Sequence, residues 1–201
     1  VAIRFTEQFR LPRKKGKERF LLESKFEFAK ELIKKAGQYI LDHMQEDLCV
    51  ETKSSPTDLV TRLDKEVQEL LVSEILSRYP EDKICAEEGC LRASVQEGKA
   101  WVIDPIDGTN NFVAQQEDFA VMMAYFENGQ GQFGLIYDVV KGDCYHGGGA
   151  FSVCRNDKPL APFKAKPLGD FLIAGNSGML ETNEWGLADL SRAVLGVRVY
   201  G

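Results

Sequence analysis

The sequence predicts an α+β fold in which helices pack on a mostly antiparallel sheet. Two segments with helical periodicity come first, at 23–45 and about 64–79, and a series of short apolar segments with strand character follows them. Helices followed by a run of strands favour this layered arrangement over one in which strands and helices alternate. We expect an N-terminal α+β domain over 23–150 and the start of an incomplete C-terminal α/β domain over 151–201.

Each helical segment carries one apolar face. In the first, five apolar residues recur at helical spacing: Phe26, Ala29, Ile33, Ala36 and Ile40. In the second, the predicted buried residues are Val67, Leu70, Leu71 and Ile75. Thr61 and Asp64 are spaced as in a capping box, and Pro80 stops the helix, so the second segment has both a start and a stop signal.

Four strands are predicted in the middle of the chain: 83–86, 100–103, 119–126 and 133–140. Asn128-Gly129 is a hairpin signal between the last two. A short strand is predicted over 48–53 with a turn at 54–58, and 183–194 has helical character. The glycines of 129–134 fit the G-x-G-x-x-G dinucleotide pattern, but they precede a strand rather than open a helix, so we reject that site.

Composition excludes several classes of protein. No apolar run approaches the roughly 20 residues of a spanning helix, and no secretory signal is evident, so we expect a soluble cytoplasmic protein without a membrane partner. Five cysteines without a C-x-x-C pair argue against a disulfide framework and a zinc site, and two histidines leave little for a Ser-His-Asp triad. Acid–base or metal chemistry must then rest on carboxylates.

The first 22 residues form a basic arm in an acidic chain. Residues 1–19 carry seven basic and two acidic residues, whereas the whole chain has a net charge of -6. Such an arm can contact nucleic acid or another anionic surface. A solvated, disordered terminus or an expression remnant over 1–22 is the simpler interpretation, so nucleic acid is not an expected partner.

The most informative stretch is Asp104-Pro105-Ile106-Asp107-Gly108-Thr109, which follows an apolar strand. Two carboxylates three residues apart, followed by a helix start, can hold hard cations and a phosphate. Taken singly, each acid has a structural interpretation: Asp64 as a helix cap, Glu87-Glu88 as an exposed turn, and Asp104 as a strand end. Together they indicate a phosphatase in which two Mg²⁺ ions, about 3.5–4 Å apart, activate water and neutralise the leaving oxygen.

In combination these motifs resemble the inositol monophosphatase family of lithium-sensitive, Mg²⁺-dependent phosphatases. The similarity begins near Phe26, reaches the last residue, and is carried by 53–61 with Asp64, 87–89, 101–113, 147–151 and 195–201. It implies a sugar-phosphatase type of fold, a possible homodimer and two or three Mg²⁺ ions. By position, Glu87, Asp104 and the Ile106 carbonyl would hold the first ion, and Asp104 and Asp107 the second. Glu88 would line the same pocket.

The resemblance also implies roles in the reaction. Thr109 and Asp64 would orient the attacking water, and Glu87 would contribute through its metal ion. The amides of Gly108 and Thr109, with Asp107 beside them, would bind the phosphate of the substrate. Water would attack directly, without a phosphoenzyme, in keeping with the lack of a well-placed His or Cys nucleophile.

The substrate stays open at the level of sequence. Inositol monophosphate is favoured because Asp107-Gly108-Thr109-Asn110-Asn111-Phe112 resembles that branch more than the fructose bisphosphatase branch. A nucleotide, NADP or fructose bisphosphate phosphatase is the alternative within the superfamily. A non-catalytic regulatory or nucleic-acid-contacting relative that retains the fold is the alternative outside the enzyme class.

One family feature has no counterpart in this sequence. The family carries a further Mg²⁺ ligand in a C-terminal Trp-Asp motif, whereas here Trp185 is followed by Gly186 and the chain ends at Gly201. We therefore expect the C-terminal part of the family to be lacking. On this view the complete protein is an active phosphatase, and the 201-residue piece is weakly active or inactive.

Overall fold

The structure is a computed structural model that describes residues 16–53, 59–86, 94–162, 164–175 and 177–199. The chain divides into two compact units, 1–160 and 161–201, which we describe separately. The first unit contains all of the predicted site residues that the structure describes. Glu87 and Glu88 lie outside the described residues, as does the predicted turn at 54–58.

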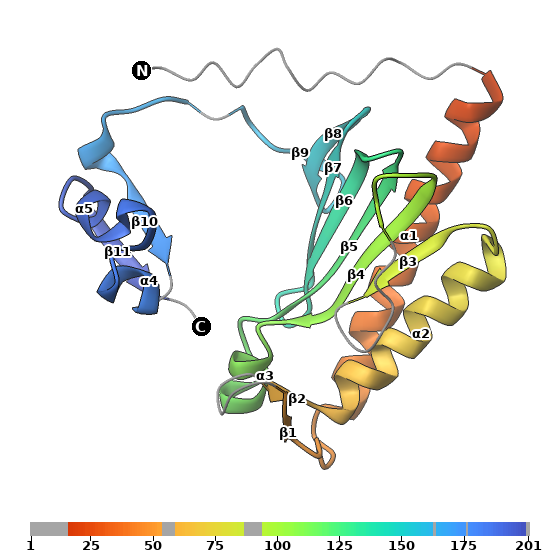
Figure 1. Cartoon of the computed structure of the whole chain (residues 1–201), viewed down its shortest axis with the longest axis horizontal. Coiled ribbons are helices and arrows are strands. Elements are labelled where there is room, and N and C mark those ends of the chain that lie inside the picture. Colours follow the sequence, from red (N-terminus) through yellow and green to blue (C-terminus); the bar gives the residue numbers. More distant parts are fainter. Residues whose placement is uncertain (1–15, 54–58, 87–93, 163, 176, 200–201) are drawn as a thin grey trace. The chain divides into compact units, whose positions relative to one another are not determined.

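Within the described residues, the first unit is built on a seven-stranded sheet with two long helices on one face (Figure 1). The helices are α1 (Gly16–His43) and α2 (Arg62–Arg78). In spatial order the strands are β3 (Lys83–Ala86), β4 (Lys99–Asp107), β5 (Ala120–Glu127), β6 (Gln130–Asp138), β7 (Asp143–Gly148), β8 (Phe151–Arg155) and β9 (Lys158–Pro159). The β3–β4 pair is parallel and the remaining pairs of this sheet are antiparallel. The predicted α+β fold is confirmed.

The helices and the sheet share one apolar core because their apolar faces meet. All five predicted residues of α1 are buried. Alternate residues of the central strands are buried with them: Trp101, Ile103, Val121, Met123, Tyr125, Phe133 and Leu135. The core contains three of the predicted α2 residues, Val67, Leu71 and Ile75. The prediction differs at two positions, since Leu70 is only partly buried and Leu63 is also buried.

A buried ion pair ties α1 to the strand that leads into the site. The Lys25 ammonium contacts the Asp82 carboxylate, and both side chains are almost fully buried. Trp101 of β4 donates its indole N–H to Asp82 Oδ2 at 2.8 Å. The ammonium also lies 4.2 Å and 4.5 Å from the ring centroids of Tyr79 and Tyr125. Burial lowers the pKa of Lys25, and the Asp82 carboxylate opposes that shift.

The N-terminal helix is longer than predicted. It begins at Gly16, so 16–22 are helical rather than part of a disordered arm, and Leu22 is buried. The apolar periodicity of the first face continues backwards through Leu22, although the basic residues around it masked that pattern. Residues 1–15 of the predicted arm lie outside the described residues.

The predicted hairpin is confirmed, since β5 and β6 are antiparallel neighbours joined at Asn128-Gly129. The glycines of the rejected dinucleotide pattern therefore lie in this hairpin and in β6. The strand predicted over 48–53 is shorter: β1 (Glu51–Thr52) pairs with β2 (Leu59–Val60) in a separate antiparallel ribbon.

The second unit contains a parallel pair of strands, β10 (Leu172–Gly175) and β11 (Gly196–Val199). Short helical segments accompany them: η1 (Leu168–Asp170), α4 (Ser177–Glu181), η2 (Glu184–Gly186) and α5 (Leu187–Ser191). Only part of the predicted 183–194 helix is therefore formed. Because β8 and β9 belong to the first sheet, the units divide at 160 rather than at the predicted 150.

Neither long helix is a transmembrane candidate. Among the residues that the structure describes, no helix combines the length and the apolar character needed to cross a membrane.

Candidate active site

A bulge at the end of β4 presents the two aspartates. Asp104 pairs with Met122 of β5 and Asp107 with Ala120, so three steps on β4 oppose two on β5. The extra residue bends a strand locally and changes where its side chains point. Pro105 lies inside the bulge, where a residue without an N–H costs the ladder least. The sequence predicted a strand over 100–103; instead the strand begins at Lys99 and continues to Asp107.

The side chains around the bulge differ in exposure. Ile106 is buried and anchors the strand end in the core, whereas Asp104 is half-buried and Asp107 is exposed. An anchored residue between two carboxylates limits the movement of both. The bulge therefore offers two carboxylates and the Ile106 carbonyl within four consecutive residues.

Gly108 turns the chain from β4 into α3 (Thr109–Gln115). It is the N-cap of this helix, with φ 88° and ψ 38°, in the left-handed region that favours glycine. A Cβ at this position would lie 3.1 Å from the carbonyl oxygen of Asp118. Because glycine has no side chain to cap the helix, the first amides of α3 are not capped by their N-cap residue. Such amides suit an anion.

The side chains of Asp64, at the start of α2, and Thr109, at the start of α3, contact each other. Thr109 Oγ1 lies 3.3 Å from Asp64 Oδ1 and 3.0 Å from the Ile106 carbonyl oxygen. Since a hydroxyl has one proton, it donates to one of these oxygens at a time. The structure thus brings together the end of β4, the start of α3 and the start of α2.

The capping box of α2 fixes the other oxygen of Asp64. Asp64 Oδ2 accepts from the Thr61 backbone N–H at 2.8 Å and from the Thr61 hydroxyl at 2.6 Å. Asp64 is 1% exposed and Thr61 is fully buried. The predicted capping box is confirmed, and it leaves Oδ1 directed toward Thr109. Asp64 therefore has a structural role that does not exclude a chemical one.

The donors at this site suit a hard cation. The carboxylates of Asp104 and Asp107 and the Ile106 carbonyl are oxygen ligands of the kind that Mg²⁺ prefers. Both histidines lie elsewhere: His43 contacts the Tyr39 carbonyl, and His146 packs against Phe26. Among the described residues, no group of three or more His, Cys, Asp or Glu side chains could hold a metal ion. Glu87, a predicted ligand, is not among them.

Comparison with known proteins identifies the family. A family model described as "Inositol monophosphatase family" matches residues 21–197 of this chain. The chain belongs to the inositol monophosphatase family. Among curated relatives, an inositol-1-monophosphatase from Bacillus subtilis is 42% identical over 180 residues, covering 87% of this chain and 68% of that protein. Human inositol monophosphatase 1 is 35% identical over 138 residues, covering 66% of this chain and 49% of that protein.

Solved structures of the family share the fold. SaIMPase-II with bound inositol monophosphate matches with a TM-score of 0.75 at 30% identity, covering 88% of this chain and 65% of that one. An IMPase/NADP phosphatase complexed with Mg²⁺ and phosphate matches with a TM-score of 0.80 at 28% identity, covering 89% and 67%. The chain thus spans between about half and two thirds of the length of these relatives.

Family membership and the fold were therefore predicted correctly from the motifs. Of the predicted site residues, the structure places Asp64, Thr109 and Ile106 in contact, with Asp104, Asp107 and Gly108 on the same continuous stretch. What the motifs did not reveal is how the two helix starts are held. Arg62 and Gln116, which contact the segment after α1, carried no sequence signal beyond ordinary surface polarity.

Proposed function

We propose that the full-length protein hydrolyses a small phosphomonoester, inositol monophosphate in the first place, by direct attack of water with Mg²⁺ as cofactor. The observation that carries this proposal is the contact of Thr109 with both Asp64 and the Ile106 carbonyl, at the end of the strand that bears Asp104 and Asp107. If Asp64 served only to cap α2, the strand end that carries Asp104 and Asp107 would not need to lie beside it.

Asp104, the Ile106 carbonyl and Asp107, together with Glu87, would hold two or three Mg²⁺ ions. Bound Mg²⁺ would supply a more acidic water and charge neutralisation at the phosphate and the leaving oxygen. The protein's own part is to fix these oxygen donors, and the buried Ile106 side chain does so at the bulge.

Asp64 and Thr109 would orient the attacking water. When the Thr109 hydroxyl donates its proton to Asp64 Oδ1, the hydroxyl oxygen keeps a lone pair to accept a hydrogen bond from water. Holding water in line with the scissile bond converts a random encounter into an oriented one. The amides of Gly108 and Thr109 would bind the phosphate at the start of α3, beside Asp107.

The relatives support the choice of substrate class. The Bacillus subtilis protein is named for inositol-1-phosphate hydrolysis, and one matching structure holds inositol monophosphate. Another match is an IMPase/NADP phosphatase, which makes NADP the second candidate substrate. Contacts to the non-reacting part of the substrate decide between them.

Phosphate release tests this proposal. The full-length protein would be assayed with inositol monophosphate, NADP, a nucleoside monophosphate and fructose bisphosphate, with Mg²⁺, with EDTA and with added Li⁺. We expect inositol monophosphate to be hydrolysed fastest, EDTA to abolish the activity, Mg²⁺ to restore it and Li⁺ to lower it. Hydrolysis that persists in EDTA would rule out the metal-dependent mechanism; preference for NADP would select the second substrate. A cytoplasmic location and a homodimer stay predictions.

A further inference from the structure

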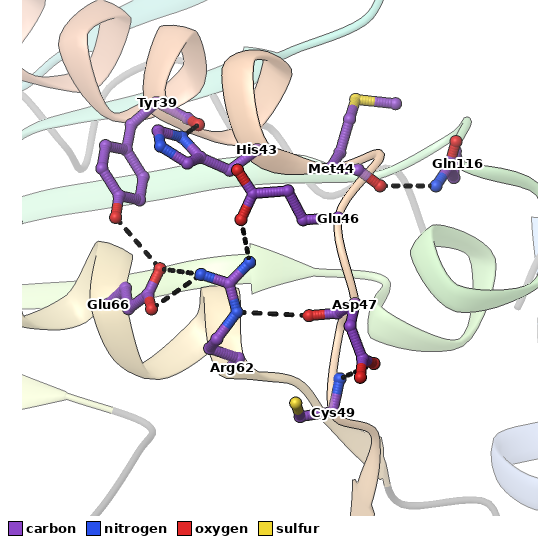
Figure 2. A network of polar contacts seen from close by, with 9 residues as sticks. All are labelled: Tyr39, His43, Met44, Glu46, Asp47, Cys49, Arg62, Glu66 and Gln116. Carbon is purple, nitrogen blue, oxygen red and sulfur yellow. Dashed lines mark hydrogen bonds and ion pairs between the residues drawn. The ribbon is translucent and has the colours of Figure 1, made fainter.

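Arg62 fastens the start of α2 to residues 44–48, the segment that follows α1 (Figure 2). Its backbone N–H donates to the Leu48 carbonyl at 2.8 Å. Its side chain donates from Nε to the Asp47 carbonyl at 3.2 Å, and Nη2 lies 2.8 Å from Glu46 Oε2. A planar guanidinium with several fixed partners holds one orientation better than a lysine would. The first turn of α2 is therefore tied to the 44–48 segment by three separate contacts.

The same guanidinium is also fixed from its own helix. Arg62 Nη1 lies 2.9 Å from both carboxylate oxygens of Glu66, one turn along α2. Glu66 Oε2 in turn accepts the Tyr39 hydroxyl of α1 at 3.0 Å, and this raises the pKa of Tyr39. Arg62 thus joins α1, the 44–48 segment and α2 in one network (Figure 2).

Gln116 fastens the far end of α3 to the same segment. It is the C-cap of α3, with φ 56° and ψ 28°. Its Nε2 donates to the Met44 carbonyl at 2.7 Å, and its Oε1 accepts from Gln45 Nε2 at 2.7 Å. Since α3 is a helix of seven residues, an anchor at Gln116 also limits the position of Thr109 at its other end.

The 44–48 segment is itself held in place. The Met44 amide donates to the Ile40 carbonyl at 2.8 Å, which extends α1, and the Cys49 amide donates to Asp47 Oδ1 at 3.0 Å. The segment can therefore act as a shared reference point for two helices that are distant in sequence.

We propose that Arg62 and Gln116 are positioning residues that align Asp64 with Thr109 by anchoring α2 and α3 to the 44–48 segment. Asp64 lies two residues after Arg62, and its 3.3 Å approach to Thr109 is already longer than the roughly 2.5–3.0 Å of most hydroxyl hydrogen bonds, so a small further shift breaks the contact. This inference rests on the proposed function, in which these two side chains orient the attacking water.

If the Arg62 network had a purely structural role, its loss would have different effects from those of a positioning role. Arg62 is 29% exposed and Glu46 is 55% exposed, and pairs of this kind add little stability. If the network only stabilised the fold, its loss would change unfolding and leave the turnover of the folded protein unchanged. A positioning role lowers kcat, and for Arg62, which acts through Asp64, it leaves substrate and metal binding intact.

The test compares Arg62→Gln, Gln116→Ala and Arg62→Lys in the full-length protein. Because a displacement of about 1 Å can cost about a hundredfold in rate, we expect kcat to fall about tenfold or more in the first two variants. In Arg62→Gln, KM and the Mg²⁺ concentration for half-maximal rate should stay within about twofold of wild type, and Arg62→Lys should recover part of kcat. In Gln116→Ala, KM should rise together with the fall in kcat, because the Thr109 amide is a proposed phosphate ligand. Lys35→Gln is the control, since it removes another α1–α2 ion pair, Lys35 with Glu74 at 2.6 Å, and should leave kcat unchanged.

A double-mutant cycle shows whether Arg62 acts through Asp64. In an Asp64→Asn background, adding Arg62→Gln should lower kcat by no more than about twofold, because the aligned partner is already lost. Fully additive losses would overturn the inference, and so would unchanged kcat in both anchoring variants.

Hydrogen exchange separates this inference from the proposed function. In Arg62→Gln and Gln116→Ala, the amides of Asp64 and Phe112 should exchange faster than in wild type and in Lys35→Gln. If wild type released no phosphate from any substrate, the proposed function would be wrong, and faster exchange would still support the anchoring. Unchanged exchange would overturn the anchoring whatever the activity.

Discussion

At the scale of single residues, the candidate site depends on Gly108. Its left-handed backbone lets the chain pass directly from the β4 bulge into α3, and its lack of a Cβ lets it approach the Asp118 carbonyl. Both features place the Thr109 hydroxyl beside Asp64. Gly108 therefore sets the position of Thr109 relative to Asp64, which the carboxylates alone do not determine.

We predict that Gly108→Ala lowers both stability and activity. A left-handed alanine costs about 1–2 kcal/mol, and the 3.1 Å approach to Asp118 adds to that cost. Unfolding in urea would measure the loss of stability, and kcat of the folded variant the loss of activity. Gly142→Ala is the matched control, because it has φ 67° and no atom within 4 Å of an added Cβ. Equal kcat in the two variants would contradict the account.

Most of the candidate site residues could be proposed from sequence because they are contiguous in the chain. Asp104, Ile106, Asp107, Gly108 and Thr109 follow one another in the chain, so one motif reveals them together. The capping spacing predicted Asp64 as a helix cap, and the resemblance to the family predicted its place in the site. Arg62 and Gln116 could not be found, because their partners in the 44–48 segment become neighbours only when three helices pack.

At the scale of elements, β4 is the part that carries the acids to the surface. Its apolar half is buried, and Trp101 bonds to the Asp82–Lys25 pair three residues before Asp104. A buried charge pair of this kind adds little net stability while intact, but losing one partner leaves the other charge uncompensated. The pair therefore helps to define where β4 lies against α1.

We predict that Lys25→Met destabilises the protein by about 3–5 kcal/mol, because it leaves the Asp82 carboxylate buried without its cation. Lys35→Met, which removes a half-exposed partner of Glu74, should cost only about 0–1 kcal/mol. Urea unfolding at neutral pH compares the two. If the two substitutions lowered the free energy of unfolding by equally small amounts, the buried pair would not hold β4 in place.

Element types were predicted better than element ends. The helices, the hairpin and the mostly antiparallel sheet follow from apolar periodicity and turn residues, which are local signals. The start of α1 at Gly16 and the continuation of β4 through Pro105 were missed. Both depend on tertiary contacts: burial of Leu22 in the core, and pairing of Asp107 with Ala120 across a bulge.

At the scale of the whole molecule, membership of the inositol monophosphatase family and the α+β fold are established, whereas the activity is proposed. The chain matches the family over 21–197 and covers about two thirds of the Bacillus subtilis relative. The central claim is that the end of β4 holds Mg²⁺ for phosphomonoester hydrolysis by the full-length protein.

The rate of phosphate release from inositol monophosphate, measured against Mg²⁺ concentration, tests this claim most directly. We predict Mg²⁺-dependent release by the full-length wild type. Asp107→Asn should raise the half-maximal Mg²⁺ concentration at least about tenfold, since even outer-shell changes cost about 10- to 100-fold in metal affinity or activity. Asp138→Asn, an equal change of charge at the end of β6, should behave as wild type. Identical Mg²⁺ dependence in Asp107→Asn and wild type would contradict the account.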